Sequence, residues 1–191
     1  MILKMNLLST FQIIVFILGT IFIILLSKRS LRSFQHHGFY RFFVFEFTLT
    51  LLVLNIPYWF DYLLSIYQIV SWILLFYSGL LLIQSIYFFQ KYGGSKRRRN
   101  DKGNLEFENT TSLIQEGIYK YIRHPMYGSL MFLALGAMFK HINIISVLLA
   151  ILISIFIFLT AKVEEKENIK FFGLDYKDYM KKTKMFVPYT F

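Results

Sequence analysis

Three long runs without a charged residue constrain this chain more than any other feature. They cover residues 7–26, 62–90 and 142–161. A helix rises about 1.5 Å per residue, so about 20 apolar residues cross a hydrocarbon layer that is roughly 30 Å thick. Each run is long enough for such a crossing, and 56% of all residues are hydrophobic. We therefore expect an all-α, polytopic membrane protein.

The apolar segments predict about five transmembrane helices. Their approximate ranges are 7–26, 42–58, 63–89, 126–139 and 144–160. The fourth segment is short for a span, and we expect it to tilt or to stop short of the full thickness. It should form a helical hairpin with the fifth. Beyond this hairpin, residues 162–181 show apolar residues at helical spacing, which predicts an amphipathic helix with a break at Gly173.

Basic residues are concentrated beside the apolar segments, and the formal net charge is +10. With five crossings, the basic clusters at 28–32, 96–99 and 177–184 share one side. This asymmetry assigns that side to the cytosol and the N-terminus to the outside. Attraction to anionic lipid headgroups explains the charge better than nucleic acid, which we do not expect as a partner.

Cysteine is absent, which excludes disulfides, thiolate metal ligands and a cysteine nucleophile. We expect no metal site. The sequence leaves the oligomeric state and the source organism open.

The polar residues of greatest interest flank the predicted hairpin. Arg123 and His124 precede Pro125, which suits the first turn of a helix, and Tyr127 follows within that turn. Glu164 and a second glutamate beside it come just after the fifth span. If the two helices are antiparallel, these carboxylates return to the level of Arg123. The helix N-terminus and Arg123 favour an anion there, but Arg123 bound to lipid phosphate and a solvated glutamate pair are equally simple explanations.

The order and spacing of these residues resemble a known family. The pattern consists of Gly117-x-Tyr119, Arg123-His124-Pro125-x-Tyr127, Glu164-Glu165, Phe172-Gly173-x-x-Tyr176-x-x-Tyr179 and Phe186-Val187-Pro188. It is similar to the isoprenylcysteine carboxyl methyltransferases, which are membrane-embedded, S-adenosylmethionine-dependent enzymes related to phospholipid N-methyltransferases. The resemblance covers roughly residues 111–188, and it implies a membrane methyltransferase with a lipophilic acceptor.

The resemblance also implies a set of site residues. The cofactor S-adenosylmethionine, and its product S-adenosylhomocysteine, would contact Thr111, Ser112, Leu113, Ile114, Tyr119, His124, Pro125, Met126, Tyr127 and Glu164. Arg123 and Glu165 are the expected catalytic residues. The chain then divides into three N-terminal transmembrane helices at 1–90 and a catalytic region at 91–191. That region would hold the cofactor-binding loop, the hairpin and the cytosolic C-terminal helix.

One departure from the family's pattern bears on the acceptor. The carboxyl methyltransferases carry an arginine a few residues before the glutamate pair, and that position is Thr160 here. An isoprenylcysteine α-carboxylate is therefore one candidate acceptor, and a phospholipid amine is another. We expect either acceptor to reach the site sideways from the bilayer. The competing functions are an NADPH-dependent membrane reductase of the sterol type and a protein that keeps the pocket without catalysis. The active site should face the cytosol, in the cell membrane of a prokaryote or the endoplasmic reticulum of a eukaryote.

Overall fold

The computed structural model describes residues 9–94 and 110–188, and within these ranges every regular element is a helix. The long helices are α1 (Thr10–Ser27), α2 (His37–Asn55), α3 (Ile66–Tyr92), α4 (Pro125–Lys140) and α5 (Ile144–Phe172). The short elements are η1 (Ser30–Arg32), η2 (Ile56–Tyr58), η4 (Gly117–Lys120) and α6 (Leu174–Lys182). The basic cluster predicted at 96–99 lies outside the described residues.

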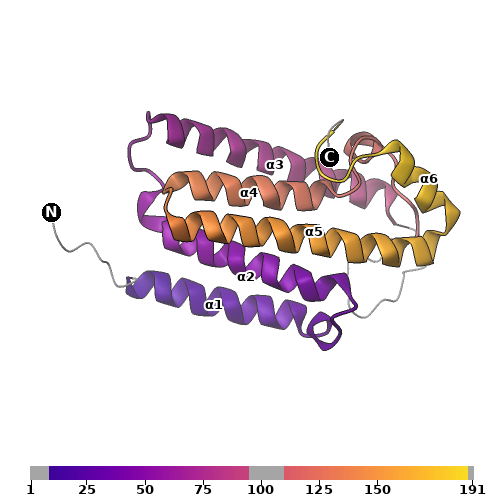
Figure 1. The fold of residues 1–191 in the computed structure, drawn as a ribbon, viewed down its shortest axis with the longest axis horizontal. Helices are drawn as coiled ribbons and strands as arrows, with labels where there is room; N and C mark the ends of the chain where they lie inside the picture. Colours follow the sequence, from indigo (N-terminus) through magenta and orange to yellow (C-terminus); the bar gives the residue numbers. More distant parts are fainter. Residues whose placement is uncertain (1–8, 95–109, 189–191) are drawn as a thin grey trace.

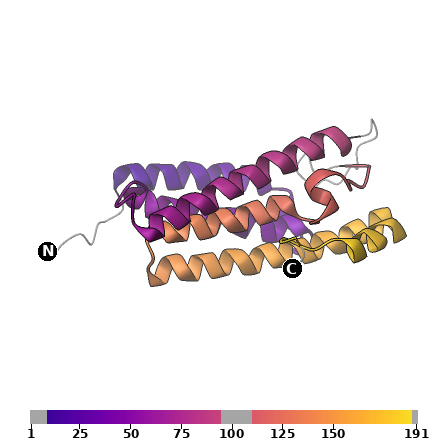
Figure 2. The same ribbon diagram turned by 90° about the horizontal axis from the view of Figure 1, so that it is seen from above.

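The five long helices run side by side along the length of the molecule (Figures 1 and 2). Four helical segments have the length and hydropathy needed to cross a bilayer, at Thr10–Ser27, His37–Tyr58, Ile66–Tyr92 and Ile144–Phe172. Helix α4 has only 16 residues. The prediction of an all-helical, polytopic membrane protein is confirmed, and so is the shortness of its fourth apolar segment.

The helices do not pack simply in the order of the chain. Helix α3 packs mainly against α4, α2 packs mainly against α5, and α1 lies on α2. Helices α2 and α3 therefore pack on the hairpin of α4 and α5 from two sides, and α1 lies on the outside of α2 (Figure 1). Because of this interleaving, the regions 1–90 and 91–191 share one bundle, and their functional division stays a prediction.

Small and polar residues hold α4 in the interior of the bundle. Asn55 of α2 donates a hydrogen bond to the carbonyl of Ala137, at 2.8 Å. Ser71 and Ser78 of α3 donate to the carbonyls of Gly136 and Ser129, both at 2.7 Å. Small residues allow helix backbones to approach closely in membranes, where polar side chains hydrogen-bond between helices. The position of the short helix α4 is thus determined by hydrogen bonds and packing with α2 and α3.

Two helix boundaries differ from the sequence-based expectation. Helix α2 begins at His37, five residues before the predicted residue 42, because the ring of His36 caps it by accepting a hydrogen bond from the Gly38 N–H. Helix α5 continues to Phe172, well past the predicted residue 160. Hydropathy marks where a helix leaves the lipid, whereas a capping side chain or a glycine marks where it ends. The predicted break at Gly173 is confirmed, since this residue has φ of +65° and separates α5 from α6.

Gly117 provides a test of the turn that precedes α4. It opens η4 with φ of +58°, and a Cβ at this position would meet the ring of Phe88 on α3. Gly117→Ala should lower the free energy of unfolding by about 2 kcal/mol or more. The cost of a left-handed backbone at alanine and the cost of the clash between its Cβ and Phe88 add to each other. Thermal unfolding in detergent measures the change. Gly79→Ala in α3 is the matched control, since a Cβ there meets nothing within 4 Å. Equal stability of the two variants would contradict the tight packing of this turn.

Candidate active site at the polar end of the hairpin

The motif that precedes α4 is held in place by the C-terminal segment of the chain. The backbone N–H groups of Arg123 and His124 donate to the carbonyls of Lys184 and Met185, at 2.8 and 3.1 Å. The Lys184 N–H donates back to the carbonyl of Tyr121, at 2.9 Å. This short parallel pairing joins the motif to the residues just before Phe186-Val187-Pro188. It also means that the N–H groups of Arg123 and His124 already have carbonyl partners and are not available to an anion.

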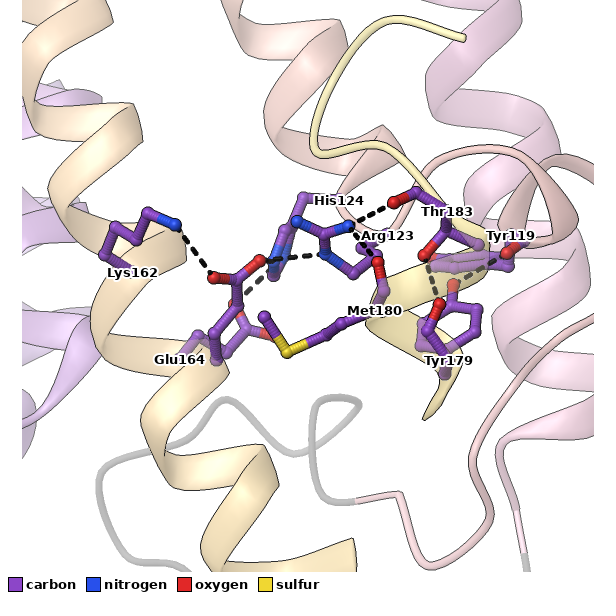
Figure 3. Close-up of polar contacts among 9 residues, drawn as sticks. Tyr119, Arg123, His124, Lys162, Glu164, Tyr179, Met180 and Thr183 are labelled. Atoms are coloured by element: carbon purple, nitrogen blue, oxygen red, sulfur yellow. Dashed lines mark hydrogen bonds and ion pairs between the residues drawn. The ribbon is translucent and has the colours of Figure 1, made fainter. Parts of the chain in front are cut away.

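The Arg123 side chain ties the start of α4 to α5 and α6. Its Nε donates to Oε1 of Glu165 at 2.8 Å, and its Nη1 donates to the carbonyls of Met180, at 3.2 Å, and Thr183 (Figure 3). Glu165 is 3% exposed. The guanidinium is therefore largely occupied by protein groups. The catalytic roles expected for Arg123 and Glu165 stay predictions, and the geometry adds a structural role for both.

Helices α4 and α5 are antiparallel, and the glutamate pair returns to the level of the motif as expected. The Tyr127 hydroxyl donates to Oε2 of Glu164 at 2.6 Å. His124 lies between the two carboxylates, with Nδ1 3.9 Å from Glu164 Oε2 and Nε2 3.6 Å from Glu165 Oε1. The Glu164 side chain is 27% exposed, so one carboxylate of the pair reaches solvent-accessible space.

Three buried tyrosines line the site where α6 packs against η4: Tyr176 and Tyr179 of α6 and Tyr119 of η4. The Tyr179 hydroxyl donates to the carbonyl of Tyr119, at 2.7 Å (Figure 3). Burial raises the pKa of Tyr119 well above the ordinary phenol range, and the negative charge of Glu164 raises it further. Burial and Glu164 likewise raise the pKa of Tyr176, and burial followed by the neighbouring Tyr176 raises that of Tyr179. All three side chains are therefore neutral hydrogen-bond donors at physiological pH.

These elements enclose a pocket at the end of the bundle where α6 packs. It contains about 790 Å³ of space not filled by protein atoms, including the solvent at its mouth. Its lining includes most of the predicted site residues, namely Ser112, Leu113, Ile114, Tyr119, Arg123, His124, Pro125, Met126, Tyr127 and Glu164. Thr111 and Glu165, which were also expected at the site, are not part of the lining.

The structure adds lining residues that sequence reasoning did not assign to the site. They are His37, Phe89, Thr110, Glu167, Asn168, Phe172, Tyr176 and Tyr179. Glu167 and Asn168 follow Glu164 by three and four residues on one continuous helix, so helical periodicity from Glu164 was a usable signal. No comparable signal existed for His37, because it reaches the pocket from α2, 130 residues away from Glu167 in sequence.

Comparison with known proteins relates the chain to methyltransferases. A model of the phospholipid methyltransferase family matches residues 67–175, which is more than half of the 191-residue chain. The chain is also 36% identical over 78 residues to a protein-S-isoprenylcysteine O-methyltransferase from Schizosaccharomyces pombe. That alignment covers 40% of this chain and 33% of the relative, so the chain matches about a third of the length of this curated relative. No solved structure gives a significant match.

The family match contains α3, the motif before α4, the whole hairpin and the glutamate pair. These elements build most of the pocket. On the strength of this match, the chain belongs to the phospholipid methyltransferase family.

Proposed function

We propose that this protein transfers a methyl group from S-adenosylmethionine to a lipophilic acceptor at the membrane surface. The observation that carries the proposal is the pocket shared by Tyr119, His124, Tyr127 and Glu164 at the polar end of the hairpin. The phospholipid methyltransferase family match implies a methyl donor, and S-adenosylmethionine is the donor that the pocket chemistry favours.

The residues present suit this cofactor. His124 lines the pocket, with Nδ1 3.9 Å from Oε2 of Glu164 and the buried Nε2 3.6 Å from Oε1 of Glu165. Nε2 makes no hydrogen bond among the described residues, and the polar ring is one group that a bound ligand can contact. Glu164 provides a partly exposed carboxylate, and Tyr119 and Phe89 provide aromatic surface. A cation with an aromatic ring system matches this combination.

Bound in this pocket, S-adenosylmethionine would supply an electrophilic methyl group on a sulfonium centre. The carboxylate of Glu164 balances the positive charge, and the Tyr127 hydroxyl fixes the orientation of that carboxylate. The buried aromatic side chains exclude water from the site. Methyl transfer is a displacement that depends mostly on proximity and alignment, so these residues act by holding the reactants together.

Two acceptor classes remain candidates. A carboxylate, such as that of an isoprenylcysteine, is already a nucleophile at neutral pH. An amine must first lose a proton before it can attack. One observation favours the amine. Thr160 stands at the position of the family's carboxylate-orienting arginine, but it is fully buried and donates its hydroxyl to the Phe156 carbonyl at 2.6 Å. It therefore offers an acceptor carboxylate neither a positive charge nor a spare donor.

Ligand stabilisation separates this proposal from a reductase. S-adenosylhomocysteine should raise the unfolding temperature of the detergent-solubilised protein in a saturable way, because a ligand that binds only the folded state stabilises it. NADPH at the same concentration should have no effect. Stabilisation by NADPH alone would contradict the proposal and favour the sterol-type reductase.

Membrane topology provides a second test. We propose that the C-terminal helix and the pocket face the cytosol. The chain contains no cysteine, so single-cysteine variants give clean labelling. Lys177→Cys on the exposed side of α6 should react with a membrane-impermeant maleimide only from the cytosolic side. Asp61→Cys, in the connection between α2 and α3, should react only from outside. The reverse pattern would contradict the orientation.

A further inference from the structure

One wall of the pocket is formed in part by a residue outside the segment that the family match covers. His37 is the first residue of α2, and it lines the pocket together with Glu167 and Asn168 of α5. The family match begins only at residue 67. This wall therefore follows from how α2 packs on α5 and not from the shared sequence pattern.

A single carboxylate fixes the start of α2 against α5. Oε1 of Glu167 accepts a hydrogen bond from the backbone N–H of His37, at 3.0 Å, and Oε2 lies 2.6 Å from Nδ1 of the same residue. The two side chains are 3% and 16% exposed. A carboxylate at a helix N-terminus is favoured by the helix dipole, and burial strengthens its hydrogen bonds. The contact is thus a two-point clamp between the two helices.

Both nitrogens of the His37 ring face protein groups. Nδ1 lies against the Glu167 carboxylate, and because a carboxylate only accepts hydrogen bonds, Nδ1 donates. Nε2 lies 3.5 Å from Nη1 of Arg41. The ring is therefore held in place as a wall of the pocket.

The position of this wall matches the side from which a lipophilic molecule would arrive. The apolar segment of α2 starts near residue 42, five residues after His37, and the uncharged run of α5 ends at Ala161, six residues before Glu167. At a rise of about 1.5 Å per residue, the wall lies roughly 8–9 Å beyond the apolar segments, at the level of the lipid headgroups. Most residues assigned to the cofactor lie on η4, on α4 and in the segment before them, and Glu164 lies on α5, three residues before Glu167.

We propose that His37 forms the acceptor side of the pocket and that Glu167 is the positioning residue that holds it there. This inference rests on the proposed methyl transfer and deepens it. A headgroup bound against His37 would leave its hydrocarbon tail in the bilayer. Glu164 serves the cofactor side, and Glu167, three residues further along α5, serves the acceptor side.

Steady-state kinetics of Glu167→Gln test this division. The amide can still accept from the His37 N–H, but its NH₂ group cannot accept the Nδ1 proton, so the ring loses its anchor. The acceptors are N-acetyl-S-farnesylcysteine and phosphatidylethanolamine in detergent micelles. For the acceptor that the wild-type protein uses, the KM should rise about tenfold or more, since small misplacements cost rate and affinity steeply. The dissociation constant of S-adenosylhomocysteine should stay within about twofold of wild type.

Companion variants distinguish positioning from general damage. His37→Ala should raise the same KM, and the double variant should be no worse than either single variant, because both disrupt one unit. Glu164→Gln should show the opposite pattern, with weaker S-adenosylhomocysteine binding. Asp178→Asn, an exposed member of a surface ion pair on α6, is the control that should leave all constants unchanged. If His37→Ala does not fold, Glu167→Gln alone tests the positioning role, because the substitution preserves the shape of the side chain.

The outcomes separate this inference from the function on which it rests. A wild-type protein that methylates neither acceptor contradicts the proposed function. If the wild type is active, weaker S-adenosylhomocysteine binding by Glu167→Gln with an unchanged acceptor KM would place the wall on the cofactor side and overturn the inference. Wild-type constants in both single variants would overturn it as well.

Discussion

Arg123→Ala is expected to be the most destabilising single substitution in the region that joins the hairpin to α6. It removes the 2.8 Å hydrogen bond to Glu165 and two hydrogen bonds to carbonyls at the end of α6. Breaking a buried ion pair by removing one partner typically costs about 3–5 kcal/mol, because the other charge stays buried. Arg123→Lys should restore little of this stability, since one ammonium cannot reproduce the planar, multi-point geometry.

Thermal unfolding in detergent measures this loss, and the surface pair of Lys181 and Asp178 gives the control. Those two side chains are 76% and 60% exposed, so Lys181→Ala should change the unfolding temperature little. If Arg123→Ala unfolds at the temperature of the control, the ion pair has no structural role. If Arg123→Ala is as stable as the wild type but inactive, the result would support the catalytic role that the sequence predicts for Arg123.

Tyr127→Phe and His124→Ala should have the largest effects on cofactor binding. Tyr127 orients the Glu164 carboxylate through a 2.6 Å hydrogen bond, and the His124 ring lines the pocket. Losing a hydrogen bond to a charged group costs about 1.5–3 kcal/mol, so the affinity for S-adenosylhomocysteine should fall at least about tenfold.

Calorimetric titration of the purified variants measures this affinity. Tyr67→Phe is the matched control, because Tyr67 lies on the exposed surface of α3 near the opposite end of the bundle and should leave binding unchanged. Unchanged affinity in both Tyr127→Phe and His124→Ala would remove these residues from the cofactor site.

Much of the fold and of the hairpin site was predictable from local sequence features. The uncharged runs indicate the spans, Pro125 marks the first residue of α4, and Gly173 marks the break between α5 and α6. The antiparallel hairpin then brings Glu164 to the level of His124 by geometry alone. Each of these conclusions depends on residues that are close in sequence or on one simple rule of helix pairing.

The rest of the site depends on contacts between distant segments, which no local pattern encodes. His37 meets Glu167 across 130 residues, and the backbone of Lys184 pairs with that of Tyr121. The same packing gives Arg123 partners within the protein, since its backbone N–H, Nε and Nη1 donate to the C-terminal segment, α5 and the end of α6. Sequence reasoning singled out Arg123 but could not account for these partners.

Transfer of labelled methyl groups tests the central claim most directly. The purified protein is supplied with S-adenosylmethionine carrying a labelled methyl group and with two sets of acceptors. One set contains membrane lipids and isoprenylcysteines, and the other contains small water-soluble acids and amines. We predict that the label enters the lipophilic set and that Tyr127→Phe reduces the transfer. Robust labelling of the water-soluble set alone would contradict a lipophilic acceptor, and no transfer to either set would contradict the assignment as a methyltransferase.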